Sequence, residues 1–172
     1  MAQIVIRTAK PGDARAIAEI HVAAWRIAYR GLIADEVMQS ISVGERRGFW
    51  KGVLSKPGGW KVDLAEDDDG AVAFCSYGPT RDEDSDGAAE IYALYVHPDK
   101  WRRKAGRTLC EHALREAALR GHGAMTLWVV KGNDQACRFY ERLGFARDGA
   151  ERKNTQLLPT PFDELRYRKV IA

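Results

Sequence analysis

The chain of 172 residues contains only three cysteines and four histidines, and it has no long uninterrupted hydrophobic segment. Cys75, Cys110 and Cys137 are odd in number and widely spaced, which is typical of reduced thiols rather than of a disulfide framework. The histidines show no metal-ligand spacing with the cysteines, so we expect no bound metal. No charged start precedes an apolar segment, and no apolar run could cross a bilayer. These absences predict a cytoplasmic protein without a membrane partner.

The chain also lacks a strong excess of charge of one sign. It has 27 Lys and Arg against 24 Asp and Glu, a formal net charge of +3, and acidic runs at 66–69 and 82–86 interrupt any basic face. This balance argues against a nucleic acid partner. With 45% hydrophobic residues, the length suits one globular domain over 1–172 with a sizeable core.

Apolar spacing and turn residues give the order of the elements. Asp13 is a plausible N-cap for a helix that ends at Gly31, and Asp67 to Gly70 form a hairpin turn. A strand, a helix and a strand follow one another in the middle of the chain, which indicates an α/β or α+β sheet domain. The expected strands are 4–6, 60–66, 71–77, one beginning at 90, 125–130 and 164–171; the expected helices are 13–31, 34–54 with a break near 42–44, 106–121 and 133–143.

The segment 90–107 carries the strongest functional signal. An aromatic, hydrophobic strand stops at Pro98, and a cluster of cations then opens a helix. Backbone N–H groups at a helix start have no intrahelical partner, so residues here can present donors to an anion, and Gly106 allows close approach. The segment predicts a binding site for a phosphate-bearing ligand; a solvated basic helix start is the alternative. The residues concerned are Arg102, Arg103, Lys104, Ala105, Gly106 and Arg107.

Two motifs resemble the GCN5-related N-acetyltransferase (GNAT) superfamily. The sequence V-H-P-D-K-W-R-R-K-A-G-R-T-L at 96–109 is similar to the family's pyrophosphate loop, and W-V-V-K-G-N-D-Q-A-C-R-F-Y-E-R-L-G-F at 128–145 is similar to its strand, loop and helix. The stretch 24–36 resembles the amino-terminal signature of one bacterial subgroup. The loop departs from the family pattern, because Trp101 replaces the usual Arg or Gln and Lys104 replaces the usual first glycine.

The resemblance implies a single domain with a mixed central sheet of about six to seven strands flanked by helices on both faces. It also implies transfer of an acetyl group from acetyl-CoA to a primary amine. Glu90 matches the family's base, and Tyr140 its general acid; a solvated strand end and a core tyrosine are the respective alternatives. A helix N-cap is the alternative for Asn133. The implied cofactor-binding residues are Leu94, Tyr95, Val96, Trp101, Arg102, Arg103, Lys104, Ala105, Gly106, Arg107, Asn133, Ala136, Phe139 and Tyr140.

Several alternatives stay open at this point. No histidine is placed to activate Cys137 or Cys110, so direct transfer in a ternary complex is favoured over a covalent intermediate. The departures at Trp101 and Lys104 keep a non-catalytic acyl-CoA sensor as the competing function. The acceptor is expected to bind among the segments 28–35, 79–87 and 154–162, whose mixed charges select no substrate class. The resemblance to the family also implies a homodimer.

Overall fold

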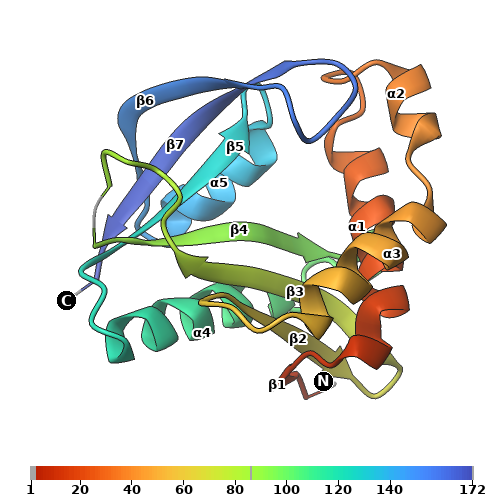
Figure 1. Ribbon diagram of the computed structural model, residues 1–172, viewed down its shortest axis with the longest axis horizontal. Coiled ribbons are helices and arrows are strands. Elements are labelled where there is room, and N and C mark those ends of the chain that lie inside the picture. Colours follow the sequence, from red (N-terminus) through yellow and green to blue (C-terminus); the bar gives the residue numbers. More distant parts are fainter. Residues whose placement is uncertain (1–2, 86, 172) are drawn as a thin grey trace.

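A computed structural model describes residues 3–85 and 87–171. Residues 1, 2, 86 and 172, which include the ends of the expected domain and one position of its acidic loop, lie outside the described residues. Seven strands form one sheet in the order β1-β2-β3-β4-β5-β7-β6 (Figure 1). Only the β4–β5 pair is parallel, so the sheet is mixed. The strands are β1 (Val5–Thr8), β2 (Lys61–Asp67), β3 (Gly70–Pro79), β4 (Ala89–Val96), β5 (Ala124–Val130), β6 (Ala146–Asn154) and β7 (Phe162–Val170).

Helices cover both faces of the sheet. Helix α1 packs with α3 over one face, where Ile17, Trp50 and Phe74 share an apolar cluster. Helices α4 and α5 cover the other face, where Leu109 and Tyr140 pack with Leu127. No helix of the described chain is both long and apolar enough to cross a membrane. The helices are α1 (Ala14–Ala28), α2 (Asp35–Ser40), α3 (Val43–Ser55), α4 (Ala105–Leu119) and α5 (Asp134–Arg142), with short 3-10 turns η1 (Pro11–Asp13) and η2 (Pro98–Lys100).

The starts of α1 and α3 differ in how they are capped. The expected break between the two helices after Gly31 occurs at Ser42, whose hydroxyl accepts a hydrogen bond from the backbone N–H of Glu45 and caps α3. Asp13 precedes α1 as predicted but does not cap it through its side chain. Its carboxylate instead accepts hydrogen bonds from the backbone of Lys10 and the guanidinium of Arg7.

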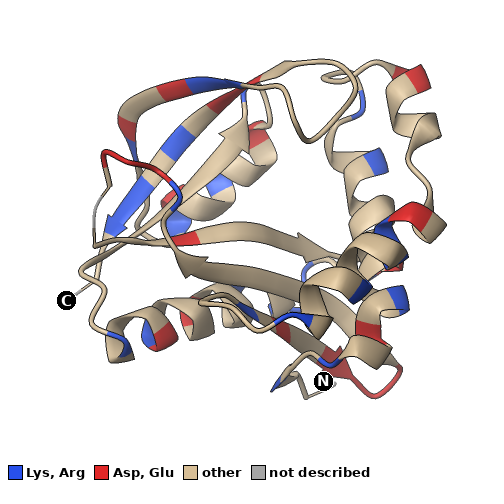
Figure 2. Ribbon diagram, viewed as in Figure 1, with Lys and Arg blue, Asp and Glu red and all other residues tan. Residues whose placement is uncertain are grey.

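Strand β6 is absent from the prediction. Its sequence is mostly charged, and it is an edge strand with mainly exposed side chains that pairs only with β7. Both signs of charge occur along β6 and β7 (Figure 2). A strand that buries no face has no apolar alternation to reveal it.

Candidate active site

Strands β4 and β5 run parallel only over their first residues. Ala89, Glu90 and Ile91 pair with Met125, Thr126 and Leu127, and the pairing ends there. Beyond it, a cavity of about 70 Å³ lies between the two strands and is lined from both. The β5-facing backbone groups of the outer part of β4 are therefore free to bind a ligand.

A β-bulge accompanies this divergence. On its other side β4 pairs with β3, where Ser76 lies opposite Ala93 and Tyr77 lies opposite Ile91. Tyr92 is therefore the extra residue. A bulge of this kind bends a strand and increases its twist, which explains why β4 leaves β5 at this point.

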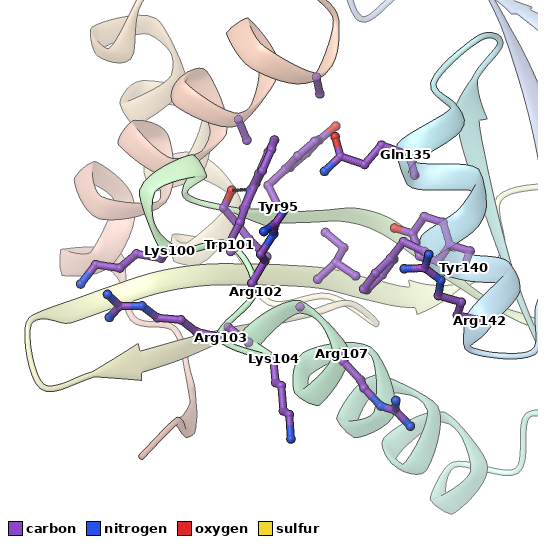
Figure 3. Close-up of a pocket in the computed structure, with 18 of the residues that line it drawn as sticks. Tyr95, Lys100, Trp101, Arg102, Arg103, Lys104, Arg107, Gln135, Tyr140 and Arg142 are labelled. Atoms are coloured by element: carbon purple, nitrogen blue, oxygen red, sulfur yellow. Dashed lines mark hydrogen bonds between the residues drawn. The ribbon is translucent and has the colours of Figure 1, made fainter. Parts of the chain in front are cut away.

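A larger cavity, of about 510 Å³, opens where β4 meets the start of α4 and the start of α5 (Figure 3). The structure brings to this cavity every residue that the sequence predicted for cofactor binding. They are Leu94, Tyr95, Val96, Trp101, Arg102, Arg103, Lys104, Ala105, Gly106, Arg107, Asn133, Ala136, Phe139 and Tyr140. Ala24, Ala28, Lys100, Gln135 and Arg142 line it as well.

The loop before α4 has a backbone conformation suited to an anion. Arg102 and Lys104 have φ angles of 67° and 66°, in the left-handed region, and Lys104 is the N-cap of α4. A backbone that enters the left-handed region at every second residue turns successive N–H groups to one side and makes an anion-binding concavity. Lys104 also stands where the family usually has glycine, the residue that adopts this conformation without strain.

Salt bridges hold this loop against the β2–β3 hairpin. The Lys100 ammonium lies 3.1 Å from Asp67 and 2.7 Å from Asp69, and Arg103 lies 3.2 Å from Asp67. Among the described residues, Arg102, Lys104 and Arg142 form no salt bridge. Some cations of the cavity thus position the loop. Arg102, Lys104 and Arg142 have no acidic partner among the described residues and are available to a bound anion.

Trp101 and Gly106 fix the loop to the end of β4. The indole N–H of Trp101 donates a hydrogen bond to the carbonyl of Val96 at 3.1 Å (Figure 3). A side chain on Gly106 would meet Val96 at 3.0 Å and Phe139 at 3.5 Å. The missing side chain therefore lets α4 start close to β4; that it also lets a ligand approach the backbone stays a prediction.

Helix α5 supplies the opposite wall. Its N-cap Asn133 accepts a hydrogen bond from the backbone N–H of Ala136 at 3.2 Å, so the amide nitrogen of Asn133 remains available to a ligand. Gln135 and Arg142 were missed by the motif comparison. Their spacing to Phe139, four and three residues, places all three on one helical side and could have revealed them.

Tyr140 lies where the two cavities meet. Both cavities are lined by Leu94, Tyr95, Asn133, Ala136 and Tyr140. Burial raises the pKa of the Tyr140 phenol well above its usual value, so the hydroxyl is protonated at neutral pH. Within the described residues this hydroxyl makes no hydrogen bond. The Tyr140 hydroxyl therefore carries a proton that it does not already donate to another described residue.

Glu90 lies away from this meeting point and lines neither cavity. Its carboxylate is 1% exposed, and both oxygens accept hydrogen bonds from Arg81. The closest of these contacts, to the Arg81 guanidinium, is 2.6 Å. The structure thus places Glu90 where it anchors the segment 79–85.

The family model described as the acetyltransferase (GNAT) family matches residues 14–145. The chain belongs to this family. It is 32% identical over 131 residues to YuaI of Bacillus subtilis, named an uncharacterized N-acetyltransferase, across 76% of this chain and 73% of YuaI. It is also 26% identical to the L-amino acid N-acyltransferase MnaT of Escherichia coli, across 81% of this chain and 78% of MnaT.

Solved structures of the family share the fold. The PaiA N-acetyltransferase of Thermoplasma acidophilum, crystallised with coenzyme A, has a TM-score of 0.76 at 20% identity and covers 98% of this chain and 99% of its own. A GNAT protein from Rhodopseudomonas palustris has a TM-score of 0.79 at 22% identity and covers 99% and 97%. The predicted family and fold class, and the predicted N-acetyltransferase class of enzyme, are thereby confirmed.

Proposed function

We propose that the protein transfers an acetyl group from acetyl-CoA directly to a primary amine in a ternary complex. Acetyl-CoA is the acyl donor, as in the family to which the chain belongs. The observation that carries the proposal is the meeting of two cavities at Tyr140. One cavity, with cations and helix N–H groups, suits the cofactor's phosphates, and the other reaches the thioester position from between β4 and β5.

The cofactor's parts follow the larger cavity. Its pyrophosphate binds the backbone N–H groups and cations of 102–107, and Arg142 adds charge from α5. The pantetheine arm runs along the free edge of β4, between Leu94 and the amide of Asn133. A backbone N–H at the bulged part of β4 polarises the thioester carbonyl, where negative charge develops during attack.

Tyr140 acts as general acid in this proposal. The amine nitrogen forms a bond to the thioester carbon, the carbon–sulfur bond breaks, and the thiolate takes a proton from the phenol. The nitrogen then loses a proton, which restores Tyr140. Glu90 remains the base predicted by resemblance to the family, but Arg81 engages both of its oxygens. Glu90→Gln tests that role directly.

Free coenzyme A released from acetyl-CoA in the presence of a panel of primary amines tests the proposal. Amino acids come first in that panel because of the similarity to MnaT. Amine-dependent release of the thiol, together with mass-spectrometric detection of the acetylated amine, would support the proposal. Tight binding of acetyl-CoA without turnover on any amine would instead favour a non-catalytic acyl-CoA sensor.

A further inference from the structure

Two tyrosine hydroxyls meet beside the smaller cavity. Tyr29, at the end of α1, and Tyr95, on β4, have their hydroxyl oxygens 3.1 Å apart. Both residues line that cavity, and Tyr95 also lines the larger one. Under the proposed function the smaller cavity is the side from which the acceptor amine approaches the thioester, so the pair lies beside that approach.

An amine of high basicity must lose a proton before it attacks, so a proton acceptor is needed near this pair. Among the described residues, Asp63, Glu90 and Glu164 are buried as whole residues. The side chain of Asp67 is also 1% exposed, but Lys100 and Arg103 pair with it. Asp63 accepts hydrogen bonds from Thr8 and Tyr77, on the part of the sheet formed by β1 to β3, away from β5. As described above, Arg81 occupies both oxygens of Glu90.

Glu164 differs from these other carboxylates. Its Oε2 atom accepts hydrogen bonds from Arg152 at 2.6 Å and Asn154 at 3.3 Å. Its Oε1 atom accepts none from any described residue. One oxygen thus holds the carboxylate in place while the other remains free to take a proton.

The position of Glu164 connects it with the tyrosine pair. It lies on β7 opposite Val130, which lines the smaller cavity. Phe162, two residues earlier and on the same face of β7, packs in the apolar cluster that contains Tyr29 and Val130, with Tyr95 against it, so Glu164 extends from β7 on the face where the hydroxyl pair lies. Burial raises the pKa of Tyr29 and of Tyr95, and the negative charge of Glu164 acts in the same direction. Arg152, which binds Glu164, also lies 4.1 Å above the ring of the cavity residue Trp128.

We propose that Glu164, acting through the Tyr29–Tyr95 hydroxyl pair, accepts the proton that the acceptor ammonium must lose. The proposal rests on the proposed function. The ammonium gives a proton to a tyrosine oxygen as the pair passes a proton through one intervening solvent water to Glu164 Oε1, which leaves a neutral amine and a neutral carboxylic acid. After attack and release of the thiol, Glu164 returns the proton to solvent. Glu164 is a positioning and proton-accepting group that does not touch the thioester.

The basicity of the acceptor separates this role from a structural one. Acetylation is measured for Glu164→Gln with a strongly basic primary amine and with a weakly basic one that is already neutral at neutral pH. The strongly basic amine should lose roughly 10²-fold or more in kcat/KM, because general base catalysis contributes about that much. The weakly basic amine needs no base, so Glu164→Gln should acetylate it almost as fast as the unaltered protein does.

One matched variant serves as a control. Asp163→Asn removes the neighbouring exposed carboxylate of β7, which pairs with Lys153, and should leave both rates unchanged. Glu90→Gln is measured beside it as the competing base that resemblance to the family predicts. The glutamine in Glu164→Gln retains an oxygen that can accept from Arg152 and Asn154, so the melting temperature and the Kd for acetyl-CoA should be nearly unaltered. If this variant fails to fold, Tyr29→Phe is measured in the same way and should show the same selectivity.

Equal losses on the two amines would overturn the proposal, and so would a selective loss in Glu90→Gln but not in Glu164→Gln. If Glu164→Gln does not fold, equal rates for Tyr29→Phe and the unaltered protein would overturn it. An unaltered protein that binds acetyl-CoA but acetylates no amine would overturn the proposed function and this proposal together.

Discussion

Replacing Lys104 by glycine should stabilise the protein and at the same time weaken its affinity for acetyl-CoA. Lys104 has φ 66° and ψ 0° at the N-cap of α4. The left-handed conformation costs a residue with a side chain about 1–2 kcal/mol. Glycine removes that cost but gains about 0.4–1 kcal/mol of conformational freedom in the unfolded chain. The free energy of unfolding should therefore rise by about 0.5–1 kcal/mol.

Lys104→Ala separates strain from charge. Alanine keeps a Cβ atom and therefore keeps the strain, so its stability should stay close to that of the unaltered protein and below that of Lys104→Gly. For a chain of this length the difference between the two variants corresponds to about 1–4 °C in Tm. Urea unfolding followed by circular dichroism measures it directly. Both variants lose the same ammonium group, so both should bind acetyl-CoA more weakly by a similar factor, and high salt should reduce that difference.

A glycine variant no more stable than the alanine variant would refute the assignment of strain to this residue. Equal affinity in all three proteins would show that the Lys104 ammonium does not contact the cofactor. The two readouts are independent, because stability is measured on the free protein. Together they test whether Lys104, at a position where the family usually has glycine, adds strain to the backbone and positive charge to the cofactor site.

Three further changes address other parts of the site. Tyr140→Phe should lower kcat much more than it changes the Kd for acetyl-CoA, since the general acid is needed only for departure of the thiolate; equal turnover would remove Tyr140 from the mechanism. Trp101→Phe deletes the hydrogen bond to Val96 and should destabilise the protein by about 0.5–1.5 kcal/mol in urea unfolding, whereas unchanged stability would mean that the bond is not needed to fix the loop. Arg142→Gln should weaken acetyl-CoA in a salt-dependent way, with little change in Tm; unchanged affinity at low salt would exclude Arg142 from the phosphate site.

Local sequence signals predicted many of the residues that line the larger cavity. The run of cations before α4 and the spacing along α5 are local patterns, and their residues come together because a strand followed by a helix places the helix start at the strand's end. The structure also shows what the two residues that depart from the family pattern do. Lys104 adopts the conformation that its family glycine would adopt, and Trp101 binds the end of β4.

Features that depend on distant residues cannot be derived from local sequence patterns. The bulge at Tyr92 is defined by register with β3, and the engagement of Glu90 depends on a loop nine residues earlier. The pair of Tyr29 and Tyr95 joins residues 66 positions apart. No spacing rule for one helix or one strand connects such positions, because tertiary packing decides them.

Calorimetric titration with acetyl-CoA and with S-acetylpantetheine, which lacks the pyrophosphate and the nucleotide, shows whether the 102–107 loop binds the pyrophosphate. We expect saturable binding of acetyl-CoA at one site, with much weaker binding of the truncated thioester and a further loss in Lys104→Ala. Equal affinity for the two thioesters, or no binding of acetyl-CoA at millimolar concentration, would contradict the assignment of the 102–107 loop as the pyrophosphate site.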